Sequence, residues 1–133
     1  IFVDEQDITP FLALADVLVT DVSSTMMEFA ALDKPVVLFN NPDWQKYPNY
    51  NPLDIDFAWR DIGIQTHNLE ELRSAVQESL EHPERYAEMR KKYTDQLFAN
   101  KYDGNAAQRI IETAVRMFLP DLIEKGFPGI HVA

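Results

Sequence analysis

Three short apolar runs, separated by single helical segments, constrain the fold of this chain most strongly. The runs are residues 1–3, 17–20 and 36–39, and patterns typical of helices occupy about residues 9–15 and 25–32. The runs are rich in β-branched residues and do not alternate with polar ones, which is typical of strands covered on both faces. Strands that alternate with single helices form a parallel sheet with right-handed crossovers. The sequence therefore predicts an α/β fold with about three parallel strands, followed by a helical C-terminal part.

The segment after the third run has a different composition. Residues 41–66 contain three prolines, five aromatic residues and many Asn and Asp residues. We expect a long ordered loop there, with a short strand near residues 62–65. Its aromatic side chains are interpreted as packing onto their own core rather than as a stacking surface for a ligand.

Three helices are predicted beyond this loop. The first begins at Asn68, which forms a cap pair with Glu71, and ends before residue 82. Its expected buried stripe consists of Leu69, Leu72, Val76 and Leu80. The second helix is predicted over about residues 83–98 and the third over about residues 105–119. The expected buried face of the third helix consists of Ala107, Ile110, Ile111, Ala114, Val115 and Phe118.

The 133 residues are predicted to form one partial domain, 1–133. Its parts are a β-α-β-α-β core (1–40), the aromatic loop (41–66), the helices (67–119) and a tail (120–133). The chain starts at Ile1, inside an apolar run, and three strands would leave a sheet edge unpaired. We therefore expect further strands and helices of the same sheet in an upstream part of the same chain.

The formal net charge of −10 argues against a nucleic-acid partner. The basic cluster Arg85, Arg90, Lys91 and Lys92 lies among glutamates at helical spacing, and is interpreted as a solvated helix face with i,i+4 ion pairs. The absence of cysteine excludes a disulfide framework and a thiolate metal site. No apolar stretch approaches the roughly 18 residues needed to cross a bilayer, so we expect a cytoplasmic protein.

A cluster of small polar residues follows the second apolar run. Asp21 ends that run, and Ser23, Ser24 and Thr25 come directly before a helix. In open parallel sheets, ligands bind beyond the carboxyl ends of the strands, where the next helix presents free N–H groups. Two or three such N–H groups and the three hydroxyls would form an uncharged site for a diphosphate. Glu28, one turn into the helix, would accept hydrogen bonds from ribose hydroxyls.

Thr25 and Glu28 also fit a capping box, in which each side chain bonds a free N–H group at the start of the helix. This interpretation would explain both residues without a ligand. The two interpretations compete at Glu28, because a carboxylate folded back onto its own cap cannot hold a sugar. Asp21 and two further hydroxyls in the same turn are more than a cap requires, which favours the binding site.

Three motifs occur in this chain in an order that points to one family. In DITPFLALADVLVTDVSSTMMEFAALDKPVVLF the matching residues are Asp7, Ile8, Asp16, Val17, Leu18, Thr20, Asp21, Ser23, Ser24 and Pro35. Asp43-x-x-x-Tyr47 follows, and then a D-G-x-A-x-x-R motif formed by Asp103, Gly104, Ala106 and Arg109. Together they resemble the CDP-glycerol glycerophosphotransferases of the teichoic-acid polymerase type. The resemblance covers most of residues 7–118 and implies the latter part of the Rossmann-like nucleotide-binding half of a GT-B type transferase.

The resemblance implies an enzyme that transfers glycerol phosphate from CDP-glycerol, or another nucleotide-diphosphate donor, to a cell-envelope polymer such as teichoic acid. An acceptor hydroxyl would attack the β-phosphorus of the donor while CMP leaves, with a base drawn from upstream histidines. None of His67, His82 and His131 matches those histidines, so we expect this chain to bind rather than to catalyse. We expect no cofactor, no metal, and membrane association only through a longer parent protein, at the inner face of the cell membrane. The predicted nucleotide contacts are Ser23, Ser24, Thr25, Glu28, Asp21 and Arg60.

Alternatives remain for two arginines. Arg60 would either fork onto phosphate oxygens or form an ion pair with Asp56 or Asp61. Arg109 is expected to tie the last helix to Asp103 or to the sheet rather than to a ligand.

Two other functions also remain open. Val22 and Glu28 stand where the family commonly has tyrosine and aspartate, and a glutamate there is typical of nucleotide-sugar glycosyltransferases. A GT-B glycosyltransferase is therefore the alternative enzyme. The alternative from another class is a non-catalytic α/β interaction module that binds protein through the aromatic loop.

Overall fold

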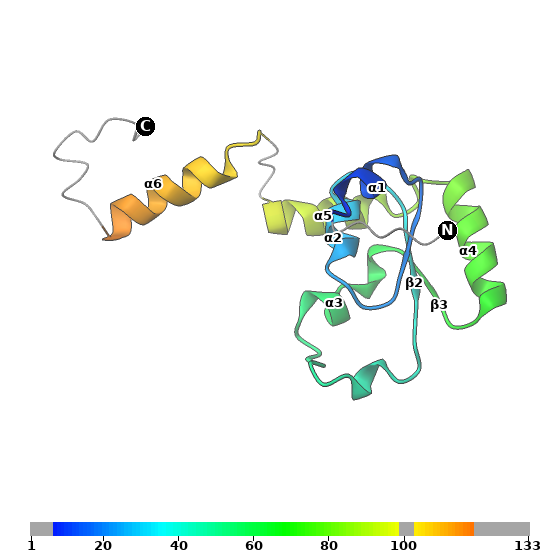
Figure 1. Ribbon diagram of the computed structural model, residues 1–133. Coiled ribbons are helices and arrows are strands. Elements are labelled where there is room, and N and C mark those ends of the chain that lie inside the picture. The colour runs from blue at the N-terminus through cyan, green and yellow to red at the C-terminus, as the bar shows by residue number, and fades with distance from the viewer. Residues whose placement is uncertain (1–6, 99–102, 119–133) are drawn as a thin grey trace. The chain divides into compact units, whose positions relative to one another are not determined.

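The computed structural model describes residues 7–98 and 103–118. The chain divides into two compact units, Ile1–Leu97 and Phe98–Ala133. The first unit contains a parallel sheet in the order β1-β2-β3, formed by β1 (Leu18–Thr20), β2 (Val36–Phe39) and β3 (Ile64–Thr66) (Figure 1). The predicted α/β fold, a partial Rossmann-like unit, is confirmed. The run predicted as a strand at residues 1–3 and the tail from residue 120 lie outside the described residues.

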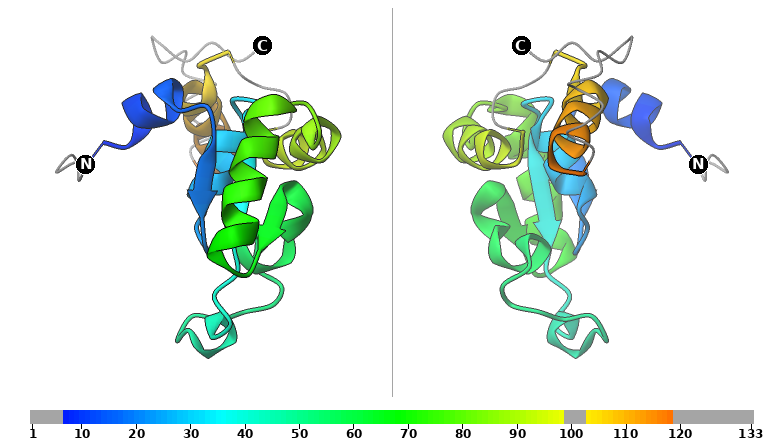
Figure 2. Two further views of the ribbon diagram at one scale, coloured as in Figure 1. Left: turned by 90° about the vertical axis from the view of Figure 1, so that its right-hand side faces the viewer. Right: turned by 90° about the vertical axis from the view of Figure 1, so that its left-hand side faces the viewer.

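Helices cover the sheet on both faces. Helix α2 (Thr25–Ala30) lies against one face and α4 (Leu69–Glu81) against the other (Figure 2). Strand β2 is buried from both sides: Val36 and Leu38 join a cluster with α2, whereas Val37 points to the opposite face. This two-sided burial is the reason that the run does not alternate with polar residues.

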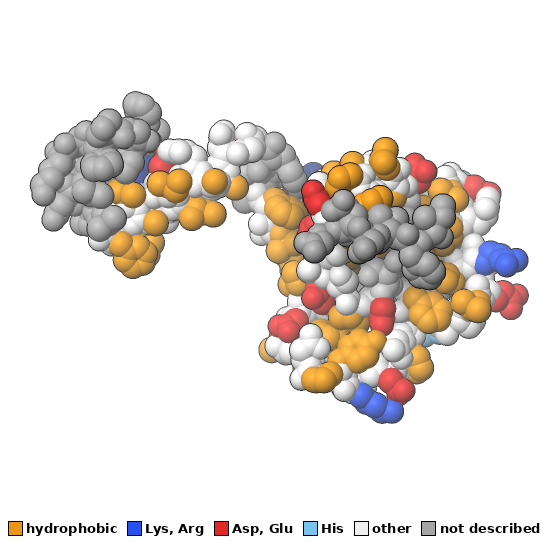
Figure 3. Space-filling model, in the orientation of Figure 1, with side chains coloured by type: hydrophobic (Ala, Val, Ile, Leu, Met, Phe, Trp, Pro, Cys, Tyr) orange, Lys and Arg blue, Asp and Glu red, His pale blue; other side chains and the backbone are white. Residues whose placement is uncertain are grey.

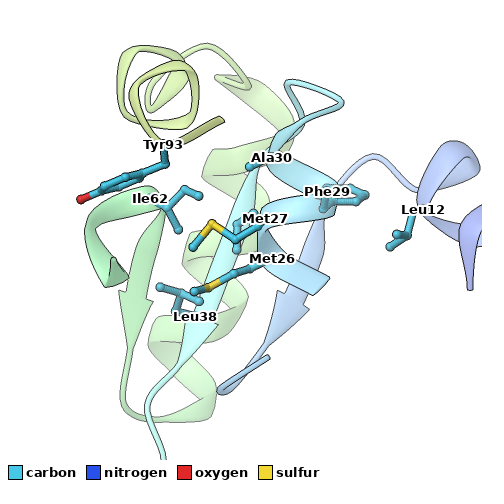
Figure 4. Close-up of a cluster of buried hydrophobic side chains, with 9 residues drawn as sticks. Leu12, Met26, Met27, Phe29, Ala30, Leu38, Ile62 and Tyr93 are labelled. Atoms are coloured by element: carbon cyan, nitrogen blue, oxygen red, sulfur yellow. The ribbon is translucent and has the colours of Figure 1, made fainter. Parts of the chain in front are cut away.

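The main hydrophobic cluster lies on the α2 side of the sheet (Figure 4). Helix α2 contributes four side chains from its buried side. The other members of the cluster come from β2, the segment before β3 and the flanking helices. The buried members are Leu12, Met26, Met27, Phe29, Ala30, Val36, Leu38, Ile62 and Tyr93. Helix α2 is only six residues long, so this packing rather than its intrinsic propensity stabilises it.

The aromatic loop is more regular than the sequence predicted. It contains the short helices η1 (Trp44–Lys46), α3 (Ile55–Ala58) and η2 (Arg60–Ile62). Trp44 packs against Tyr50 and Phe57 with ring centroids 5.4 and 5.5 Å apart. Trp59 stacks on Tyr93 of helix α5 (Ala87–Phe98), with ring centroids 4.3 Å apart. The loop aromatics therefore pack on one another and on the core, as expected.

Helix α4 begins as predicted but buries a different stripe. The Asn68 side chain accepts hydrogen bonds from the N–H groups of Glu70 and Glu71, which confirms the cap. The predicted stripe is wrong at its ends, because Leu69 is 76% exposed and Leu80 is 51% exposed. The buried residues are Ala75 and Ser79 instead. Small side chains on this face allow the helix to approach the sheet closely.

The turn between α2 and β2 anchors two other helices. Lys34 Nζ donates hydrogen bonds to three carbonyls at the end of α1 (Thr9–Leu14), those of Leu12, Ala13 and Ala15. The Asp33 carboxylate accepts hydrogen bonds from the guanidinium of Arg90 on α5, at 2.9 Å. Both helices are thus fastened to one short turn by basic side chains.

Arg90 corrects one prediction about the basic cluster. It is only 2% exposed and also donates a hydrogen bond to the Pro83 carbonyl, so it is not part of a solvated face. Lys91 behaves as expected, since it pairs with Asp95 at i,i+4. Arg85 pairs with Glu78, seven residues earlier, rather than at the predicted i,i+4 spacing. Sequence spacing alone did not distinguish the arginine that turns inward.

In the second unit the described residues form α6 (Ala106–Phe118) and the turn before it. Arg109 pairs with Asp103, which confirms the predicted tie and lowers the pKa of Asp103 to about 2. Of the predicted buried face only Val115 is buried, and hydrophobic side chains line the helix surface (Figure 3). The prediction is wrong at the exposed residues Ala107, Ile110, Ile111, Ala114 and Phe118. The described part of this unit has no second element to cover that face.

Two absences hold for residues 7–98 and 103–118 as described. No helix there combines the length and hydrophobicity needed to cross a bilayer. No group of three or more His, Cys, Asp or Glu side chains there has the arrangement of a metal site.

We predict that Gly63→Ala destabilises the first unit. A Cβ atom at Gly63 would lie 1.9 Å from the main-chain oxygen of Val36, so the backbone of β2 or β3 would have to move. We expect a loss of about 2–3 kcal/mol in the free energy of unfolding, measured by urea denaturation. Gly104→Ala is the control: it has open space around it and a φ of +73°, so it should cost only about 1 kcal/mol, from backbone strain. Equal losses in the two variants would contradict the packing explanation.

We predict that Tyr93 makes the fold sensitive to alkaline pH. Burial, together with the hydrogen bond to the Asp61 carboxylate, raises the pKa of Tyr93 from 10.0 to about 12. The protonated phenol is thus favoured in the folded state, and this contribution is complete below pH 10 and lost as the pH rises towards 12. The free energy of unfolding of the unmodified protein should therefore fall more steeply over this interval than that of Tyr93→Phe. Parallel curves would show that Tyr93 does not contribute.

Candidate functional site

The carboxyl ends of β1 and β2 are joined by one arginine. Asp21 follows β1 and Asn40 follows β2. Arg60 donates from Nη1 to the Asp21 carbonyl at 3.1 Å, and from Nε and Nη2 to Asn40 Oδ1 at 3.0 and 2.5 Å. These bonds place the residues after the two strands on one rigid edge of the sheet.

Arg60 is buried without a carboxylate in contact. It is 7% exposed, donates a fourth hydrogen bond to the Asp56 carbonyl at 3.4 Å, and its guanidinium lies 5.7 Å from the ring centre of Trp44. Burial lowers the pKa of Arg60, and the nearby Asp21 charge opposes this shift. The expected ion pair with Asp56 or Asp61 is wrong, because Arg60 uses main-chain and amide oxygens.

The Asp21 carboxylate is fixed by Tyr47. The Tyr47 hydroxyl donates to Asp21 Oδ2 at 2.7 Å and accepts a hydrogen bond from Asn41 Nδ2 at 2.9 Å. The bond to Asp21 raises the pKa of Tyr47 above its usual value. Asp21 Oδ1 is buried and has no partner among the described residues. Asp21 therefore serves first to hold the aromatic loop against the end of β1.

The Ser23–Thr25 turn starts α2 in a way that leaves polar groups free. Ser23 Oγ accepts a hydrogen bond from the Thr25 N–H at 3.3 Å and donates one to Thr25 Oγ1 at 3.0 Å. The N–H groups of Met26 and Met27 bond the carbonyls of Ser23 and Ser24. The N–H groups of Ser23 and Ser24 bond no described residue, and the Ser24 side chain is exposed.

The capping box between Thr25 and Glu28 does not form. Ser24, with helical backbone angles, precedes the helix and Thr25 already lies inside it, so the cap falls earlier than the sequence pattern suggested. Glu28 is exposed and makes no hydrogen bond or ion pair with the residues described. The structure therefore leaves Glu28 available, which removes the competing interpretation.

The histidines that the structure describes have neighbours that account for them. His67 contacts Glu71 at 3.3 Å and Asn40 at 3.2 Å, and His82 lies 3.6 Å from Glu84. His131 lies outside the described residues. Sequence analysis missed Asn40, although its place directly after a buried strand matches that of Asp21.

The family model for CDP-glycerol:poly(glycerophosphate) glycerophosphotransferases matches residues 1–116. The chain belongs to this family. A curated relative, the teichoic acid glycerol-phosphate transferase of Staphylococcus aureus (strain NCTC 8325 / PS 47), is 32% identical over 111 residues. The match covers 83% of this chain and 28% of the relative, so the chain spans less than a third of the relative's length. No solved structure matches.

We predict that Tyr47→Phe weakens the edge that this network holds together. The variant removes the hydrogen bond to the Asp21 carboxylate while keeping the ring, and should lower the free energy of unfolding by about 1–2 kcal/mol. Tyr50→Phe, three residues along the same loop, is the matched control because the Tyr50 hydroxyl bonds no described residue. It should stay within about 0.5 kcal/mol of the unmodified protein in urea denaturation. An equal response of the two variants would argue against the Asp21–Tyr47 contact.

Proposed function

We propose that this chain is the donor-nucleotide-binding part of a glycerophosphotransferase. In this proposal the Ser23–Thr25 turn holds the diphosphate of CDP-glycerol at the carboxyl end of β1. The observation that carries it is the set of unbonded groups at this turn: the N–H groups of Ser23 and Ser24 and the exposed Ser24 hydroxyl. Such donors suit phosphate oxygens, which would take the place of the water that bonds these groups in an exposed turn.

The neighbouring residues would have different roles. Glu28 is free and one turn along α2, so it would accept hydrogen bonds from the ribose hydroxyls. Asp21 would act through the backbone that it holds, because its carboxylate is bonded to Tyr47. Arg60 would support the same edge through the four hydrogen bonds that its guanidinium donates.

In the proposed reaction, an acceptor hydroxyl forms a bond to the β-phosphorus of CDP-glycerol. The bond from that phosphorus to the bridging oxygen breaks, and CMP leaves with the oxygen. The hydroxyl proton passes to a base outside the described residues. The name of the Staphylococcus aureus relative supports glycerol phosphate as the transferred group and a teichoic-acid polymer as the acceptor. We place the protein in the cytoplasm, or at the inner face of the cell membrane if other parts of a longer chain bind there.

Isothermal titration of the full-length protein with CDP-glycerol and with UDP-glucose tests this proposal. We expect tighter binding of CDP-glycerol, weakened about ten- to a hundredfold by Ser23→Ala with Ser24→Ala, because hydrogen bonds to charged phosphate are lost. Ser74→Ala on the exposed side of α4 is the control and should bind as the unmodified protein does.

Two results would overturn the proposal in different ways. Tighter binding of UDP-glucose would favour the nucleotide-sugar glycosyltransferase. If the unmodified protein binds no nucleotide, and the double serine variant is as stable as the unmodified protein, a non-catalytic interaction module is favoured.

A further inference from the structure

A second polar pocket lies at the carboxyl ends of β2 and β3. Its volume is about 350 Å³, near the lower end of the about 300–1,000 Å³ typical of small-molecule sites. The loop after β2 and the residues at the end of β3 supply its walls. The lining residues are Asn40, Asn41, Pro42, Trp44, Arg60, Gln65 and His67.

The charge of this pocket differs from that of the chain. The chain has 22 acidic residues and a net charge of −10, yet no carboxylate lines the pocket. By contrast, a pocket of about 530 Å³ beside α4 is lined by Glu70, Glu71 and Glu78. Of these two, only the pocket at the carboxyl ends of β2 and β3 is lined by a guanidinium and by no carboxylate. This pocket is therefore the one suited to an anion.

The unused hydrogen-bonding groups in this pocket are donors. Asn40 is saturated, because Oδ1 accepts two bonds from Arg60 and Nδ2 donates to Gln65 Oε1 at 3.1 Å and contacts His67 at 3.2 Å. Gln65 thus accepts a hydrogen bond with its side-chain oxygen, while its side-chain N–H groups donate to no described residue. Of the five N–H groups of Arg60, four donate to described residues and one Nη2 hydrogen remains.

The buried positive charge of Arg60 favours an anion in this pocket. It is buried, and its contacts within the described residues are neutral acceptors and the Trp44 ring rather than a carboxylate. Burying a cation is costly, and the nearby Asp21 charge offsets only part of that cost, since the net effect still lowers the pKa of Arg60. A ligand anion placed beside Arg60 would offset more of it. Arginine stays protonated at neutral pH, so the charge is always present.

We propose that this pocket binds a glycerol phosphate unit, with the phosphate near Arg60 and Gln65 and the hydroxyls among the remaining amides. The choice of glycerol phosphate rests on the proposed function, whereas the choice of an anion rests on the pocket itself. The same chemical group occurs at the transferred end of CDP-glycerol and at the end of a poly(glycerophosphate) acceptor.

The test measures binding of sn-glycerol 3-phosphate to the full-length protein by isothermal titration. Gln65→Glu adds a negative charge to the pocket, yet keeps an oxygen to accept the Asn40 hydrogen bond, so the fold should be preserved. We expect it to weaken glycerol 3-phosphate binding at least about tenfold, through repulsion of the phosphate. Gln96→Glu, the same change at an exposed position of α5 outside the pocket, should leave the affinity unchanged.

Competition distinguishes the two sources of the group. If saturating CDP-glycerol displaces glycerol 3-phosphate and Gln65→Glu weakens both ligands, the pocket holds the donor's glycerol phosphate. If both ligands bind together, it holds the acceptor's end. Failure of glycerol 3-phosphate to bind, or equal affinity in Gln65→Glu and the unmodified protein, would overturn the proposal.

The double serine variant separates this proposal from the proposed function. If Ser23→Ala with Ser24→Ala abolishes CDP-glycerol binding but leaves glycerol 3-phosphate affinity intact, the pocket is a distinct subsite and both proposals stand. If CDP-glycerol does not bind even the unmodified protein while Gln65→Glu still weakens glycerol 3-phosphate, the proposed function fails and the pocket stands.

Discussion

The guanidinium of Arg60 is the contact on which the carboxyl edge of the sheet depends. It joins the main chain after β1, the side chain after β2 and the main chain of α3, although these acceptors lie 39, 20 and 4 residues away in sequence. Parallel strands have no hairpin to align their ends, so side chains must do it. A planar group with fixed donor directions is suited to this task.

The Ser23–Thr25 turn inherits its position from this network. Asp21, two residues before the turn, is held on two sides, by Arg60 through its carbonyl and by Tyr47 through its carboxylate. Helix α2 begins at this turn, and its apolar side packs in the main hydrophobic cluster (Figure 4). The turn lies between Asp21 and α2, which are both held in place. If it binds phosphate, it would lose little conformational entropy on binding, because its backbone is already ordered.

The sequence was informative where one physical requirement dominated. Two-sided burial made the run at residues 36–39 recognisable as a strand. The run at residues 17–20 is also a strand, but the expectation that it is covered on both faces is wrong, because Val19 is 45% exposed. Asn68 with Glu71 was recognisable as a cap because its chemistry is local. The start of α2 was less certain, since Ser23, Ser24 and Thr25 are all acceptable caps and only tertiary packing chooses among them. The partners of Arg60 could not be predicted, because it bonds distant carbonyls and an amide, whereas sequence reasoning considers nearby carboxylates first. The burial of Arg90 was missed for the same reason: its partner Asp33 is 57 residues away.

The electrostatics of the chain limit how the carboxyl edge can attract an anion. A net charge of −10 repels phosphate over long range, and the basic residues near this edge are few. If the edge binds an anion as proposed, its affinity would have to come from short-range contacts. These would be main-chain N–H groups and hydroxyls at the Ser23–Thr25 turn, and a buried guanidinium with amides in the pocket beside it. Such contacts depend on geometry more than on charge, so under this proposal they would select ligands whose phosphate and hydroxyl groups match their spacing. A binding edge of this kind would discriminate between anions better than a lysine-rich surface, because it would offer little to an anion that fits it badly.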